Sequence, residues 1–158
     1  MPKVDYRKGY YRFIEEGAEV SVVGSGKKEY KSKHGYEVQA TTKVSDVKPE
    51  EFDAVIIPGG TRCPDRLRRY NEVLKIVKNV NANGKVVAAI CHGPWVLISA
   101  GIVKDREATS YFSIRDDMIN AGAIYLDKPV VVDRNLVTSR EPADLPYFCK
   151  AIIKLLQK

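Results

Sequence analysis

The chain has few of the residues that build disulfide frameworks and metal sites, with only three cysteines and two histidines in 158 residues. Cys63, Cys91 and Cys149 are odd in number and widely spaced, which fits neither a disulfide framework nor the paired ligands of a zinc site. The chain also lacks an apolar run of the roughly 20 residues needed to cross a bilayer. Its first residues, MPKVDYRKGYYRF, lack the apolar centre of a secretory signal. We therefore expect free thiols, no membrane insertion and a cytoplasmic location.

The positive charge of the chain is not gathered into one region. The formal net charge is +6, and 29% of the residues are charged. Basic side chains alternate with Asp and Glu, apart from residues 66–69 and Lys27-Lys28. This pattern is typical of a solvated basic surface and does not favour a nucleic-acid interface. The length and the 44% apolar content predict one globular domain over residues 1–158.

Short β-branched runs alternate with segments of helical period, which indicates an α/β fold with a doubly wound, mostly parallel sheet flanked by helices. Residues 86–90 form the most apolar run and predict the central strand, because they lack the alternation of a half-exposed strand. Residues 36–42 alternate and predict a strand near a sheet edge. Further strands are predicted at residues 19–23, 54–57, near Thr109, and at 124–126, 130–132 and 136–138.

Four helices are predicted from the spacing of apolar side chains. The first ends near Glu16 before Gly17, and the third begins at Pro94 and ends before Gly101. The second is predicted as a single helix that ends at Asn83-Gly84. The apolar face of this second helix consists of Leu67, Tyr70, Leu74 and Val77. The apolar face of the final helix consists of Leu145, Phe148, Cys149, Ile152 and Leu156.

A cysteine with small residues two positions before and after it stands where the central strand is expected to end. The stretch is Ala89-Ile90-Cys91-His92-Gly93, which is a nucleophile-elbow pattern with cysteine in the serine position. The helix that follows directs backbone N–H groups toward the sulfur, which should lower the thiol pKa. Pro58-Gly59-Gly60 ends a second strand at the same edge, so the amide of Gly60 or Gly59, with that of His92, could form an oxyanion hole. Cys63 and Cys149 are interpreted as inert core residues.

The general base for this cysteine has few candidates, because the chain contains only His34 and His92. His92 reaches the thiol only if the elbow turns both side chains toward one cleft, and its second nitrogen then needs an acidic partner. Asp65 is the preferred candidate for that partner. His34 is interpreted as a surface residue that could line the site.

These residues resemble the ThiJ/PfpI intracellular protease family, whose fold is that of the class I glutamine amidotransferases and is flavodoxin-like. The matching stretches cover nearly the whole chain and are residues 33–36 (KHGY), 50–60 (EEFDAVIIPGG), 88–101 (AAICHGPWVLISAG), 108–123 (ATSYFSIRDDMINAGA) and 130–146 (VVVDRNLVTSREPADLP). The resemblance implies that Cys91 is the nucleophile and His92 its partner, and that Asp65 reaches the histidine of a neighbouring subunit in a dimer or larger ring. It also implies a substrate-binding or oxyanion site that includes Gly59, Gly60, Gly93 and Tyr111, and no metal or organic cofactor.

The chain departs from that family at its beginning. Family members start with an apolar strand and a loop that carries a glutamate near the cysteine, whereas this chain begins almost directly with the first helix. We therefore expect the family's first strand to be missing. Asp5 aligns loosely with the family's glutamate.

Three functions are compatible with such a site. A nucleophilic thiol beside amide donors attacks peptide bonds, aldehydes such as methylglyoxal, and the adducts that aldehydes leave on proteins, so we expect a hydrolase of the peptidase or the deglycase and glyoxalase type. The alternative is a non-catalytic stress protein in which Cys91 senses oxidants or the surface holds unfolded proteins. Glutamine amidotransferase chemistry is disfavoured, because it pairs the cysteine with a histidine far downstream and none follows His92.

Overall fold

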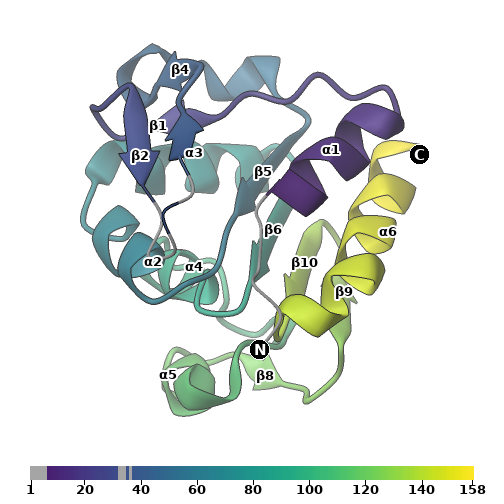
Figure 1. Ribbon diagram of the computed structural model, residues 1–158. Helices are drawn as coiled ribbons and strands as arrows, with labels where there is room; N and C mark the ends of the chain where they lie inside the picture. The colour runs from purple at the N-terminus through teal and green to yellow at the C-terminus, as the bar shows by residue number, and fades with distance from the viewer. Residues whose placement is uncertain (1–6, 32–34, 36) are drawn as a thin grey trace.

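A four-stranded sheet forms the centre of the molecule (Figure 1). The computed structural model describes residues 7–31, 35 and 37–158. The strand order is β5-β6-β10-β9, in which β5, β6 and β10 are parallel and β9 is antiparallel to β10. The strands are β5 (Ala54–Ile57), β6 (Val86–Ile90), β9 (Val130–Asp133) and β10 (Leu136–Ser139). The prediction of an α/β fold with a mostly parallel sheet is confirmed.

β6 is the interior strand that the sequence predicts. It lies between β5 and β10, and all of its residues are buried. Val87 and Ala89 pack into one hydrophobic cluster, whereas Val86, Ala88 and Ile90 pack into another. Because successive side chains of a strand point to opposite faces, an apolar residue at every position shows that both faces of the sheet are covered.

Helices cover the two faces of the sheet in the doubly wound arrangement. α1 (Arg7–Glu15) and α6 (Leu145–Leu156) lie together on one face, and α3 (Asn71–Ala82) and α4 (Pro94–Ser99) lie on the other (Figure 1). The first face buries Phe13, Phe148 and Ile152. The second buries Val77 and Leu97. The first, third and final predicted helices are therefore confirmed.

The single helix predicted after β5 is wrong, because the structure contains two helices there. α2 (Arg62–Leu67) ends in a turn, and α3 begins only at Asn71. Tyr70 has an extended backbone, with φ −94° and ψ 113°, which interrupts the helix. Leu67 and Leu74 nevertheless pack against the same hydrophobic cluster. The spacing of apolar residues therefore continues across the break at Tyr70, so the sequence does not indicate that the helix ends there.

The strands predicted in the N-terminal part are also placed differently. Of residues 19–23 only Val23 lies in a strand, β1 (Val23–Gly24), which pairs in parallel with β4 (Thr42–Lys43). The predicted strand at 36–42 is divided between β4 and β3 (Glu37–Gln39), and β3 forms a hairpin with β2 (Glu29–Lys31). Neither pair joins the central sheet; each is a separate two-stranded sheet, so β3 and β4 are edge strands, as predicted for this segment.

The remaining elements connect the sheet to the surface. They are 3-10 helices η1 (Val44–Asp46), η2 (Pro49–Glu51), η3 (Phe112–Ile114) and η4 (Pro142–Asp144), helix α5 (Arg115–Asn120), and the paired strands β7 (Glu107–Ala108) and β8 (Ile124–Tyr125).

β5 pairs with β6 and with no other strand in the described ranges. Within those ranges, no helix combines the length and the apolar character that a membrane crossing requires.

Candidate active site

Cys91 occupies a strained turn between β6 and α4. Its φ is +63°, in the left-handed region that residues with a side chain rarely adopt. Two backbone hydrogen bonds hold it there: Cys91 N donates to Ser139 O at 3.0 Å, and Tyr111 N donates to Cys91 O at 2.9 Å. Strain at a single residue fixed by neighbouring segments is a common feature of functional sites. The predicted elbow is therefore present, with the cysteine at its apex.

Two glycines allow this turn to pack against the end of β5. A Cβ atom added to Gly59 would lie 2.7 Å from Cys91 Cβ, and one added to Gly93 would lie 2.8 Å from Ile57 O and 2.9 Å from Ile90 O. Real Cβ atoms essentially never approach other atoms so closely. Small residues at these two positions are thus required by the packing of the elbow.

Burial and hydrogen bonding act in opposite directions on the Cys91 sulfur. Burial raises the pKa of the thiol, the backbone amides of Gly60 and His92 lower it as hydrogen-bond donors, and the charge of Glu141 raises it. The net direction is upward, so the expectation of a lowered pKa is wrong for the chain as described. Desolvation of the thiolate outweighs the two amide donors. Cys91 is accordingly a neutral thiol near pH 7 that must lose its proton to a base when it reacts.

His92 is positioned to be that base. Its Nδ1 lies 3.2 Å from Cys91 Sγ, and its Nε2 lies 3.1 Å from Ser113 Oγ. The ring stacks on Tyr111, with centroids 5.0 Å apart, and meets Trp95 edge-on at 5.2 Å. Burial lowers the pKa of His92, so the neutral imidazole that can accept a proton is the dominant form at pH 7.

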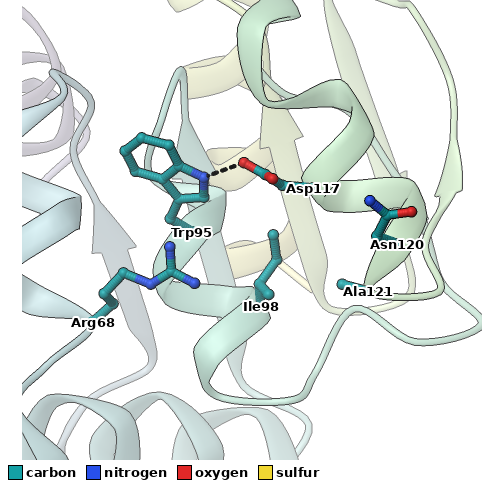
Figure 2. Close-up of a pocket in the computed structure, with 6 residues that line it drawn as sticks. All are labelled: Arg68, Trp95, Ile98, Asp117, Asn120 and Ala121. Atoms are coloured by element: carbon teal, nitrogen blue, oxygen red, sulfur yellow. Dashed lines mark hydrogen bonds between the residues drawn. The ribbon is translucent and has the colours of Figure 1, made fainter.

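Trp95 separates His92 from the hollow surface beyond it. A cavity of about 350 Å³ borders Trp95, whose indole Nε1 donates to Asp117 Oδ2 at 2.7 Å and lies opposite Arg68 (Figure 2). A second hollow of about 180 Å³ is lined by Thr61, Arg62, Asp65 and Trp95. Cys91 and His92 line neither of these hollows. The reacting sulfur is therefore half-buried and lies outside both hollows.

Most of the predicted site residues come together. Cys91, His92, Gly59, Gly60 and Tyr111 surround one point at the end of β6. His92 and Tyr111 are arranged as a stacked pair that no spacing in the sequence indicates.

Gly93 is expected in the substrate-binding or oxyanion site, but its backbone N–H is already engaged. Its N–H donates to Ile90 O at 2.9 Å, so this amide is unavailable to a substrate. The role of Gly93 is instead the close packing of the turn.

The predicted acidic partner, Asp65, is not brought to His92 within this chain. Asp65 lies on α2 beside Trp95, and in the described parts of the chain the hydrogen-bonding partner of His92 Nε2 is Ser113. A contact between His92 and Asp65 of another copy of the chain stays a prediction. Asp5 and His34 lie outside the described residues.

The interpretation of the other two cysteines is correct for one and wrong for the other. Cys149 is buried in the cluster beneath α6, as expected, whereas Cys63 is exposed on α2. The short helix α2 turns this residue outward, and periodicity gave no sign of that. Sequence reasoning also missed Ser113 and Glu141, which act on the site only through the folding of distant segments.

The upward pKa of Cys91 predicts how its alkylation depends on pH. Because only the thiolate reacts, the rate with iodoacetamide should rise with pH through a midpoint above the ordinary value of 9.0. Glu141→Gln should lower that midpoint, and Glu72→Gln, on the exposed surface of α3, should leave it unchanged. Mass spectrometry of the modified peptide gives each rate. A midpoint below pH 7 would contradict the neutral thiol.

Comparisons with known proteins agree with this fold. The model of the DJ-1/PfpI family matches residues 1–155. Deglycase PfpI of Pyrococcus furiosus is 47% identical over 94% of this chain and 89% of its own length. General stress protein 18 of Bacillus subtilis is 43% identical over 98% of this chain and 91% of its own length.

A solved structure shows the same architecture. It is a two-domain protein of Anabaena variabilis with DJ-1/ThiJ/PfpI-like and ferritin-like domains, which superimposes with a TM-score of 0.91 at 44% identity. The match covers 94% of this chain and 43% of that protein. With the family model spanning nearly every residue, the chain belongs to the DJ-1/PfpI family.

Proposed function

We propose that this protein is a cysteine-dependent hydrolase of the deglycase type, which acts on small carbonyl compounds and on their adducts with amines. The observation that carries the proposal is the contact of 3.2 Å between Cys91 Sγ and His92 Nδ1, at an elbow where the backbone amides of Gly60 and His92 lower the pKa of the thiol against the effect of burial. A similar relative, from Pyrococcus furiosus, is named a deglycase. A nucleophile with an adjacent base and fixed hydrogen-bond donors is the arrangement that acyl and carbonyl chemistry needs.

The first step is attack on the carbonyl carbon. His92 Nδ1 takes the proton of the Cys91 thiol as sulfur forms its bond to carbon. The electron pair of the C=O bond moves onto oxygen, and the amides of Gly60 and His92 stabilise the resulting oxyanion. Because these amides are fixed by the backbone, they need little reorganisation when the charge develops.

The second half of the reaction returns the enzyme to its starting state. When the attacked carbon carries an amine nitrogen, the electron pair on the oxyanion re-forms the C=O bond as the carbon–nitrogen bond breaks, and the proton held on Nδ1 passes to the departing nitrogen, which leaves a thioester. Water then adds hydroxyl to the thioester carbon as the carbon–sulfur bond breaks, and its proton returns to sulfur, which releases a carboxylic acid and restores the thiol. His92 is suited to both transfers, because burial keeps its pKa low enough for the imidazole to give up the proton again.

The proposal includes a self-association that would complete the site. Asp65 is exposed and borders the smaller hollow beside Trp95, so its carboxylate is accessible to another copy of the chain. In a dimer or larger ring it would approach the face of the site that Trp95 closes. The proposal also places the protein in the cytoplasm, with neither nucleic acid nor a membrane as its partner.

A panel of substrates tests the proposal. Methylglyoxal, a glycated amine and an unstructured peptide are incubated with the protein, and products are followed by chromatography. We expect turnover of the aldehyde or the glycated amine, with the peptide as the slower substrate. Preference for the peptide would reassign the enzyme as a peptidase.

A non-catalytic stress protein is the second candidate, because one relative is named a general stress protein. It would leave every substrate of the panel unchanged while dilute peroxide oxidised Cys91 selectively. The half-buried, neutral thiol disfavours this function, since oxidation follows exposure and thiolate character.

A further inference from the structure

The His92 imidazole can act as a base toward Cys91 in only one of its two neutral forms. To accept the thiol proton at Nδ1, the ring must carry its own hydrogen on Nε2. A hydrogen bond to the second nitrogen usually decides which neutral form a histidine adopts. In the described chain that second nitrogen faces one polar side-chain atom, Ser113 Oγ at 3.1 Å.

We propose that Ser113 is the positioning residue of the site: its hydroxyl oxygen accepts a hydrogen bond from Nε2–H of His92 and so fixes the neutral form whose Nδ1 faces Cys91. This role depends on the proposed hydrolase function only in its expected effect on kcat. The choice of protonated nitrogen is a property of the resting protein.

Ser113 is held at this position by the fold, although the residue itself is exposed. It is the middle residue of η3 (Phe112–Ile114), between Tyr111 and the buried Ile114. Tyr111 N donates to Cys91 O at 2.9 Å, and Ile114 N donates to Tyr111 O at 3.1 Å. The elbow and η3 are thus linked by backbone hydrogen bonds, which fix the backbone of Ser113 relative to that of His92.

The ring has little freedom to turn away from this arrangement. Tyr111 stacks on its face and Trp95 meets it edge-on, while sulfur and hydroxyl oppose its two nitrogens. Among the residues that the structure describes, the titratable groups in contact with the ring are Cys91 and Tyr111. A hydroxyl can accept from Nε2–H or donate to a bare Nε2, and only the first arrangement leaves Nδ1 able to take the thiol proton. Unlike a carboxylate, the hydroxyl adds no charge that would stabilise the imidazolium.

A carboxylate from another copy is the competing partner for Nε2. Asp65 is the residue expected in that place by resemblance, and it would have to displace the Ser113 hydroxyl or share the same hydrogen. The two possibilities differ in which substitution changes the His92 spectrum.

Nitrogen NMR of histidine-labelled protein tests the proposal without an activity assay. The chain has two histidines, so a His34→Gln variant assigns the His92 signals. The parent should show His92 with hydrogen on Nε2 at pH 8. Ser113→Ala should give a mixture of both neutral forms, and Ser113→Thr should restore the parent spectrum. Ser45→Ala is the matched control, because Ser45 is the exposed middle residue of η1 and bonds Asp46.

Kinetics add a second readout if the panel reveals a substrate. Ser113→Ala should lower kcat roughly three- to tenfold, the usual effect of one hydrogen bond, with KM unchanged and recovery in Ser113→Thr. A His92 spectrum that is identical in the parent and in Ser113→Ala would overturn the proposal, and more so if Asp65→Asn changed it. Because the spectrum needs no turnover, it tests the role of Ser113 even if the protein proves not to be a hydrolase.

Discussion

The Cys91→Ala variant should fold like the parent and lose hydrolysis by at least about 10⁴-fold, which is the scale of removing a catalytic nucleophile. The physical reason is that no bond to the carbonyl carbon can form once Sγ is absent, while the amides of Gly60 and His92 stay in place. Stability should change by less than about 1 kcal/mol, because alanine keeps Cβ in the same strained backbone. Steady-state rates and urea unfolding measure the two effects.

Cys63→Ala is the matched control for this experiment. Cys63 is an exposed thiol on α2 and takes no part in the proposed steps, so its removal should leave kcat/KM unchanged. If Cys91→Ala kept the parent rate, the elbow would have no part in the chemistry. Equal losses in both variants would point to a general effect of thiol removal.

Gly93→Ala should damage both stability and activity. The new methyl group would lie 2.8 to 2.9 Å from the carbonyl oxygens of Ile57 and Ile90, and backbone atoms of two sheet strands have little room to move. Overpacking of this kind costs about 1–3 kcal/mol of unfolding free energy. The resulting shift of the turn should lower kcat/KM about 10²-fold, since displacements near 1 Å have effects of that size. Urea unfolding and kinetics of the same preparation measure both.

Gly9→Ala shows what a harmless glycine substitution does in this protein. An added Cβ at Gly9, inside α1, would have Cys149 Sγ as its nearest neighbour among the described residues, at an ordinary 4.0 Å. Alanine is favoured over glycine in helices by up to about 1 kcal/mol, so this variant should be slightly more stable and fully active. If Gly93→Ala behaved in the same way, the tight packing of the elbow would be refuted.

The sequence predicted those parts of the fold in which the polarity of each residue corresponds to its burial. Val86–Ile90 is apolar at every position and is therefore interior. Pro94 and Gly101 limit α4 because proline lacks a helical N–H donor and glycine accepts a positive φ, which is +69° at Gly101. The break at Tyr70 could not be predicted, since the apolar residues on both sides of it pack on the same core.

For the site, the sequence by itself determined that a cysteine stands at a tight strand-to-helix turn, because small neighbours are a local requirement. Only the tertiary structure decided that His92 Nδ1 turns to the sulfur, that Ser113 faces Nε2, and that the Gly93 amide is already occupied. It also decided that burial and Glu141 outweigh the amide donors at Cys91. Turn geometry depends on a few adjacent residues, whereas pKa values and hydrogen-bond partners depend on groups that only folding brings together.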